Sequence, residues 1–152
     1  MKAVIQRAED ASCTVGGAVT GHIGKGLVIY FGVDRGDDES ILEKFISKML
    51  KLRIFEDEKG KMNLSIKDIG GEILFISQFT LSADVYHGNR PSFDYAEVPE
   101  KASSMYLKAA EMIRNEGIKT ELGVFGAHME IRYMNPGPAT FVLDSSCFPG
   151  LK

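Results

Sequence analysis

The first 31 residues limit the possible folds most strongly, because they hold several extended β-type runs in succession. Met1–Ala8, Ser12–Val15 and Ala18–Ile23 are three such runs. The Gly16-Gly17 pair separates the last two, and extended runs on either side of a glycine pair predict a β-hairpin. Leu27–Phe31 is continuously apolar, which is typical of a strand buried on both faces. The first third of the chain is therefore predicted to be mostly β-structure.

Two later segments have apolar residues at helical spacing. In the first, Asp37, Asp38 and Glu39 place negative charge where the start of a helix favours it. Its apolar residues are Leu42, Phe45, Ile46, Met49 and Leu50. The second helix is predicted to begin near Pro99, which suits a first helical position, and to end at Gly117. Its buried stripe is predicted to be Ala102, Met105, Tyr106, Ala109, Met112 and Ile113. One face of the first helix is expected to pack on the sheet.

The middle of the chain combines short strands with one long irregular segment. Arg53–Phe55 and Lys61–Leu64 flank an acidic turn and predict a second hairpin. Glu72–Leu81 is strongly β-prone and is predicted to be a strand. Asp84–Pro99 has no clear periodicity, and loops of this length in compact domains are usually functional or disordered. Its aromatic residues argue against disorder.

The last third of the chain returns to strands. Met129, Ile131 and Tyr133 alternate with polar residues, which predicts a half-exposed strand. Ala139–Leu143 is predicted to be the returning strand after a tight turn. Many strands with only two helices indicate a closed or sandwich-like β core with the helices on one side. The predicted fold is therefore α/β, with one β-barrel-like domain over residues 1–152 and two main helices.

Composition excludes several classes of protein. Of the 152 residues, 44% are hydrophobic and 26% are charged, which excludes a disordered, collagen-like or coiled-coil chain. The apolar runs are too short to span a bilayer, and we expect no membrane partner, no targeting segment and a cytoplasmic location. A net charge of −3 means that an RNA partner is either absent or contacted over a small footprint. Cys13 and Cys147 are expected to be buried thiols rather than a disulfide.

Standard catalytic signatures are missing from the sequence. It has no GxSxG elbow, no Walker-type phosphate loop, no GxGxxG after a strand and no HExxH. The spacing of His22, His87 and His128 does not suit a metal site, and we expect these side chains to be exposed or locally hydrogen-bonded. The carboxylates of Glu56–Glu58 are expected to form a solvated acidic face rather than an acid/base pair.

Two short segments carry polar or rigid groups that could serve a site. Ser77–Leu81 closes an apolar strand, and its hydroxyl and amide groups either satisfy the strand end or orient a polar ligand. Asn135–Thr140 places two prolines around one glycine, which fixes the backbone tightly. This second segment is either a rigid hairpin turn or a preorganised backbone wedge, with a cis bond before Pro138 as one option. Composition leaves both pairs of alternatives open.

Together these segments resemble the D-aminoacyl-tRNA deacylase family. Ser77–Leu81 is similar to the SQFTL motif of the family, and Asn135–Thr140 is similar to its NxGPxT motif. Gln6-Arg7-Ala8, Gly88–Phe93 and Phe125-Gly126-Ala127 also look like family segments. The resemblance covers essentially the whole chain. The two main motifs, in this order and at this separation, are highly specific.

The resemblance implies a cytoplasmic homodimer with no metal and no organic cofactor. It implies hydrolysis of the ester that joins a D-amino acid to the 3′-terminal adenosine of tRNA, with glycyl-tRNA as a further substrate class. Gly137-Pro138 would carry a cis peptide and project from one subunit into the partner's site, where it rejects L-aminoacyl-tRNA. Arg7 and Met129 correspond to positions that support the pocket. Contact with only the acceptor end agrees with the acidic net charge.

The resemblance also assigns roles to the first motif. Ser77, Gln78 and Phe79 would line the ester and the terminal adenosine. Thr80 has no neighbouring base in the sequence to activate it, so we expect it to position the substrate while the 2′-hydroxyl of the tRNA assists the attack of water. An aminoacyl ester is already activated, so positioning can suffice.

Three other functions are weighed against this one. A non-catalytic module that binds an RNA end or a small ligand would explain the lack of an obvious nucleophile. A structural oligomeric barrel would use the Gly-Pro turn as an interface clamp. A small-ester hydrolase would act through Ser77. Each leaves at least one of the two motifs unexplained.

Overall fold

The N-terminal hairpin is longer and more regular than the sequence predicts. In the computed structural model, which describes residues 1–149, β1 (Lys2–Val15) and β2 (Ala18–Gly32) pair antiparallel along almost their whole length. The predicted turn at Gly16-Gly17 is confirmed, and both glycines have positive φ, as a tight hairpin turn requires. The short runs predicted on each side merge because the pairing is continuous.

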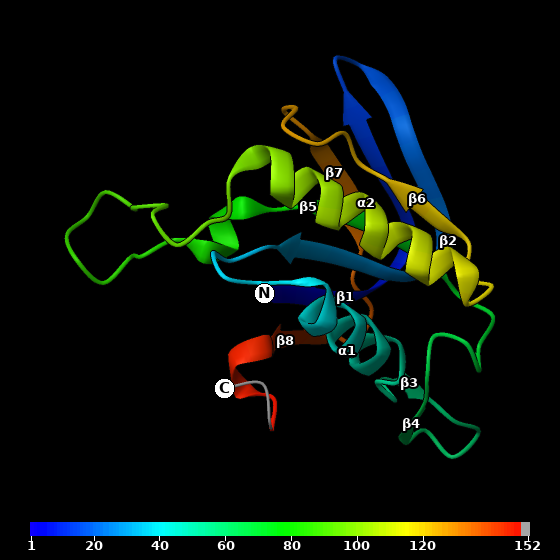
Figure 1. The fold of residues 1–152 in the computed structure, drawn as a ribbon. Helices are drawn as coiled ribbons and strands as arrows, with labels where there is room; N and C mark the ends of the chain where they lie inside the picture. Colours follow the sequence, from blue (N-terminus) through cyan, green and yellow to red (C-terminus); the bar gives the residue numbers. More distant parts are fainter. Residues whose placement is uncertain (150–152) are drawn as a thin grey trace.

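The main sheet has the order β6-β5-β2-β1-β7, and β8 also pairs with β1. The additional strands are β5 (Glu72–Ser77), β6 (Thr120–Leu122), β7 (Glu130–Met134) and β8 (Thr140–Asp144). The β2–β5 and β5–β6 pairs are parallel, and the others are antiparallel. A separate small hairpin joins β3 (Phe55–Glu56) to β4 (Met62–Leu64), as predicted. Within residues 1–149 the main sheet is an open path and not a closed ring (Figure 1).

Both predicted helices are present and cover the same face of the sheet (Figure 1). α1 (Glu39–Leu50) begins after Asp38, whose carboxylate accepts a hydrogen bond from the backbone N–H of Ile41. α2 (Pro99–Asn115) begins at its proline, where the missing N–H costs nothing. Apolar residues of both helices share one core with inward-facing residues of β1, β2 and β5. The α/β class with two main helices is confirmed.

The hairpin bends part-way along its length, and the side chains of alternate residues face opposite sides of the sheet before and after the bend. This bend positions the later strands. Ile5 belongs to the core under the helices. Ala11 and Cys13 would face the same side as Ile5 in a regular strand, but they belong to a second core on the opposite face. The reversal lies at Asp10, which is the non-glycine residue with positive φ (51°) in the described chain. β8 pairs with β1 before the bend and β7 pairs with it mainly beyond, so the turn between β7 and β8 crosses β1 near Arg7.

Other predictions need correction. The strand predicted over Glu72–Leu81 ends at Ser77, because Phe79–Ser82 forms a 3-10 helix, η1. Phe79 and Thr80 therefore lie in a helical turn and not in the strand. β6 was not predicted. Cys13 is buried as expected, but Cys147, in the short 3-10 helix η2 (Ser145–Cys147), is exposed, and both thiols are free.

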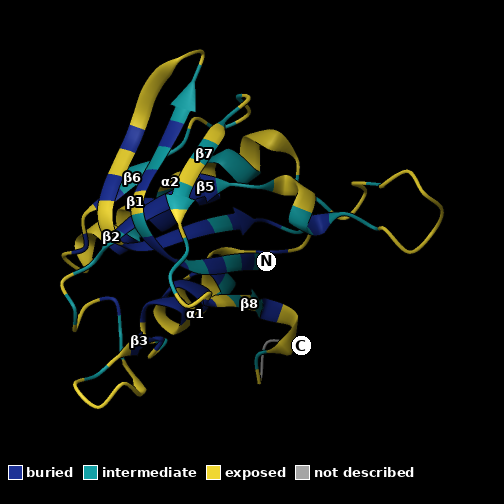
Figure 2. Ribbon diagram, turned by 180° about the vertical axis from the view of Figure 1, so that it is seen from behind, coloured by how far each residue is buried: buried dark blue, intermediate teal, exposed yellow. Residues whose placement is uncertain are grey.

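The predicted loop between η1 and α2 is confirmed, and it extends away from the rest of the molecule (Figure 1). It is held at its base by the Asp34–Ala96 and Asp84–Ser92 bridges. Figure 2 shows that its outer part is exposed, in contrast to the buried centre of the sheet. None of the helices in the described part of the chain is both long and apolar enough to cross a membrane.

Candidate active site

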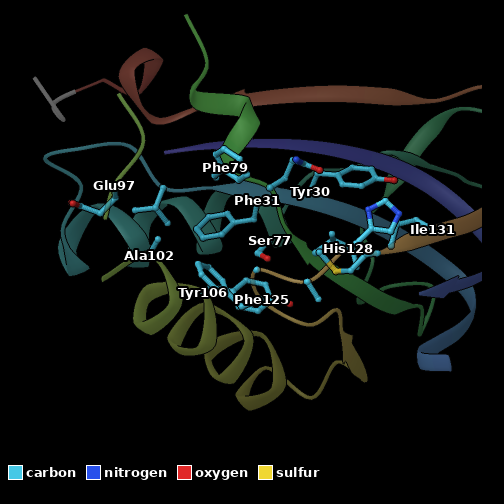
Figure 3. Close-up of a pocket in the computed structure, with 17 residues that line it drawn as sticks. Tyr30, Phe31, Ser77, Phe79, Glu97, Ala102, Tyr106, Phe125, His128 and Ile131 are labelled. Carbon is cyan, nitrogen blue, oxygen red and sulfur yellow. The ribbon is translucent and has the colours of Figure 1, made fainter. Parts of the chain in front are cut away.

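A cavity of about 300 Å³ lies where β2 and β5 end, between η1, the N-terminal part of α2 and the segment before β7 (Figure 3). Seventeen residues line it, among them Tyr30, Ser77, Gln78, Phe79, Tyr106 and Met129. The first motif reaches this cavity because β5 is buried between β2 and β6 and ends there. A volume of this size is at the lower end of the range for small-molecule sites.

The first motif lines the cavity as the strand gives way to η1. The backbone N–H of Gln78 donates to the carbonyl oxygen of Phe31 at 2.7 Å, which ends the pairing of β5 with β2. Phe79 then turns outward and makes an edge-to-face contact with Phe93, with ring centroids 4.9 Å apart. Its side chain is 57% exposed, so one aromatic face of the rim is open to a ligand. Figure 3 shows Ser77 near the centre of the cavity.

The wall formed by α2 is aromatic and electrically neutral. Tyr106 stacks on Phe75 with centroids 5.2 Å apart, and its hydroxyl donates to the carbonyl oxygen of Phe75 at 2.7 Å. Burial raises the pKa of the Tyr106 hydroxyl above its usual range. The hydroxyl therefore stays protonated and engaged, and it serves as a structural anchor rather than as an acid or base.

A polar chain leads from the other wall toward β8. Tyr133 donates its hydroxyl hydrogen to the amide oxygen of Gln6, which can only accept. The Tyr30 hydroxyl lies 3.2 Å from that of Tyr133, so it donates to the free lone pair there. Burial, and then the contact with Tyr133, raises the pKa of Tyr30. The Gln6 amide nitrogen donates to the Thr140 hydroxyl at 2.9 Å, which connects the cavity wall to the strand after the Gly-Pro turn.

The structure gathers four of the eight predicted site residues in this cavity, namely Ser77, Gln78, Phe79 and Met129. Thr80 is exposed and does not line the cavity. Its hydroxyl oxygen accepts a hydrogen bond from the Gln78 side-chain nitrogen at 2.6 Å. Thr80 is thus placed to orient the Gln78 amide, one step away from any ligand in the cavity.

The remaining three, Arg7, Gly137 and Pro138, lie outside this cavity. Arg7 and Gly137 line a second cavity of about 230 Å³ on another part of the sheet. The Gly137–Pro138 peptide bond is cis. The turn is held by Asn135, whose side-chain nitrogen donates to the carbonyl oxygens of Arg7 at 2.8 Å and Ala139 at 3.0 Å. Within one chain, therefore, the two motifs face different cavities.

Sequence reasoning missed several lining residues. Tyr30, Tyr106 and Glu97 come from elements far apart in the chain, and nothing in their local pattern marks them. His128 also lines the cavity and is exposed, whereas His22 and His87 pair at the surface with Asp10 and Asp84. Among residues 1–149, no group of three His, Cys, Asp or Glu side chains is arranged to hold a metal ion.

Comparison with known proteins places the chain in a family. The model of the family described as D-Tyr-tRNA(Tyr) deacylase matches residues 4–144. The chain belongs to this family. The membership confirms the resemblance seen in the motifs, and with it the enzyme class, an ester hydrolase.

Relatives and solved structures agree with this assignment. A D-aminoacyl-tRNA deacylase of Persephonella marina is 53% identical, and one of Aquifex aeolicus is 49% identical; each match covers 95% of this chain and 98% of the relative. The solved structure of a c-Myc DNA unwinding element binding protein is 42% identical, with a TM-score of 0.87, over 95% of this chain and 98% of that one. A probable eukaryotic D-amino acid tRNA deacylase, at 16% identity and a TM-score of 0.78 over 93% of this chain and 98% of that one, shares the fold.

Proposed function

We propose that this chain hydrolyses the ester bond of D-aminoacyl-tRNA, and of glycyl-tRNA, while sparing L-aminoacyl-tRNA. The observation that carries the proposal is the gathering of Ser77, Gln78, Phe79 and Met129 around one cavity in a chain of the deacylase family. The cavity suits one end of a ligand, and the exposed Phe79 ring offers a stacking face for the terminal adenosine. The rest of the tRNA would stay outside the cavity.

Catalysis is proposed to rest on positioning. Within residues 1–149, neither the Ser77 nor the Thr80 hydroxyl is hydrogen-bonded to a histidine or a carboxylate, so neither is set up as an activated nucleophile. The ester is already activated, and alignment of a bound water can supply much of the rate. The 2′-hydroxyl of the terminal adenosine would assist the attack of that water. No metal or organic cofactor enters this mechanism.

Selection against L-amino acids is proposed to come from Gly137-Pro138 of a second copy of the chain. The turn and the motif cavity are separate in one chain. A turn that screens the substrate must therefore reach the cavity from another subunit, which supports the predicted homodimer. A rigid backbone excludes by shape, so achiral glycine passes the filter. A cytoplasmic location, where aminoacyl-tRNA is made, belongs to the same proposal.

Deacylation of matched D-tyrosyl-, L-tyrosyl- and glycyl-tRNA tests the proposed activity. We expect rapid loss of the D and glycyl esters, with the L ester spared, because only the L side chain meets the Gly-Pro backbone. Equal loss of the D and L esters would keep the hydrolase and discard the filter. If no ester is lost, the chain is a module that binds an RNA end or a small ligand.

Thr80→Ala is expected to lower the rate of D-tyrosyl-tRNA hydrolysis only about three- to tenfold. The substitution removes one hydrogen bond that orients the Gln78 amide, and such a bond contributes about 1 kcal/mol. Single-turnover rates of the variant and the wild type, with tRNA binding measured in parallel, check this. Abolished turnover with intact binding and fold would instead make Thr80 the nucleophile.

A further inference from the structure

The side chain of Arg7 lies directly under the Gly-Pro turn. A β-carbon built on Gly137 would overlap the Nη2 atom of Arg7, so the guanidinium is packed against the backbone of that glycine. The Arg7 backbone also holds the turn, because its N–H donates to the carbonyl oxygen of Ala139 at 3.1 Å and its own carbonyl oxygen accepts from Asn135. A movement of this guanidinium would therefore change the packing against the backbone of Gly137.

Arg7 is unusual because its charge is buried and poorly compensated. The residue is 8% exposed, and its Nε atom has no hydrogen-bond partner among the described residues. A guanidinium is always charged and needs acceptors when water is excluded. Among the described residues, its one ion pair joins Nη1 to the Oε1 atom of Glu56 at 3.3 Å. This carboxylate is therefore the anionic partner of the guanidinium within residues 1–149.

Glu56 comes from an element outside the main sheet. It is the second residue of β3, in the small β3–β4 hairpin. The preceding residue, Phe55, is buried in the core under the helices, which fixes the backbone of Glu56. The Glu56 side chain is 57% exposed and lines the same cavity as Arg7, Gly137 and Pro136. Glu9 and Lys25 also line that cavity, but Glu9 makes no ion pair with Arg7, and Lys25 carries the same charge as Arg7.

We propose that Glu56 is a positioning residue for substrate selection, which holds the Arg7 guanidinium beneath Gly137 and so sets the pose of the Gly-Pro turn. Glu56 acts through Arg7 and touches no substrate. The neighbouring acidic residues of the hairpin have other surroundings: Asp57 accepts hydrogen bonds from the backbone N–H groups of Lys59 and Lys61, and Glu58 is exposed. The acidic turn is thus mostly solvated, as predicted, and Glu56 differs from its neighbours by its ion pair with Arg7.

The test rests on the proposed function and compares Glu56→Ala with Glu58→Ala, a matched control that removes the same charge from the same hairpin. In Glu56→Ala we expect the ratio of D- to L-tyrosyl-tRNA hydrolysis to fall up to about tenfold, a change of about 1.4 kcal/mol. Most of the change is expected in the L ester, which a displaced turn no longer excludes. Glu58→Ala is expected to keep the wild-type ratio.

Glu56→Gln distinguishes positioning from a general loss of stability. The amide keeps an oxygen that can accept from Arg7, so we expect its ratio to lie between those of the wild type and Glu56→Ala. A Glu56→Ala ratio equal to that of the wild type would overturn the inference, and so would an equal fall in Glu58→Ala. If the wild type itself hydrolyses no D-tyrosyl-tRNA, the proposed function fails instead. Thermal melting of each variant shows whether the fold is retained.

Discussion

Gly137→Ala is expected to lower the ratio of D- to L-tyrosyl-tRNA hydrolysis roughly 100-fold, because steric filters in pockets discriminate over about this range. Gly137 has a φ of +121°, which an alanine adopts only with strain. The new β-carbon would also overlap the Arg7 guanidinium, which is buried and paired with Glu56. Either Arg7 or the turn has to move, and both movements displace the proposed wedge.

The matched control for this variant is Gly17→Ala in the N-terminal hairpin turn. Gly17 also has positive φ (84°), but a β-carbon there meets no atom within 4 Å. This variant carries comparable backbone strain, of order 1–3 kcal/mol, at a site far from either cavity along the hairpin. We expect it to lower the melting temperature and leave the D/L ratio unchanged. An unchanged ratio in Gly137→Ala as well would show that this turn does not select the substrate.

Gly26→Ala is expected to destabilise the fold by about 4 kcal/mol or more, the range of the most severe single substitutions. Gly26 lies opposite Glu72 in the parallel pairing of β2 with β5. A β-carbon there would overlap the backbone carbonyl group of Glu72, and backbone atoms within a sheet cannot step aside as a side-chain end can. The two strands would have to separate at the start of their pairing. Urea unfolding followed by circular dichroism measures this loss.

Gly24→Ala provides the comparison in the same strand, two residues away. A β-carbon on Gly24 meets no atom within 4 Å, and its N–H donates to the Glu72 carboxylate, a hydrogen bond that alanine retains. We expect its free energy of unfolding to stay within about 0.5 kcal/mol of the wild type. Because β5 leads directly into Ser77, the Gly26 variant should also lose deacylase activity. Similar stabilities for the two variants would contradict the steric argument.

The position of the motif cavity follows from these backbone contacts. β2 and β5 run parallel and side by side, so Phe31 and Ser77 come to the same end of the sheet. The chain then leaves the sheet through η1, and the N-terminal part of α2 closes the cavity from the face that carries both helices. The elements that determine stability therefore also bring the first motif to the site.

Local patterns were sufficient to predict the elements whose residues interact mainly with near neighbours. The glycine pair at 16–17 requires a tight turn, and Pro99 and Asp38 mark helix starts through groups in the first turn alone. The end of β5 was mispredicted for the opposite reason. Residues 78–81 are as β-prone as those before them, and they leave the strand where Gln78 bonds to Phe31 and a helical turn begins.

For the site, too, local sequence patterns predicted one part and tertiary contacts decided the other. The motif letters alone identified the family, because the order and spacing of Ser77–Leu81 and Asn135–Thr140 are visible along the chain. Spacing along the chain gives no information about which cavity each motif faces or that Glu56 pairs with Arg7, 49 residues away. The cavity that each motif faces and the Glu56–Arg7 pair are set by strand pairing and by the bend at Asp10. Both bring together, or keep apart, residues that are distant in the sequence.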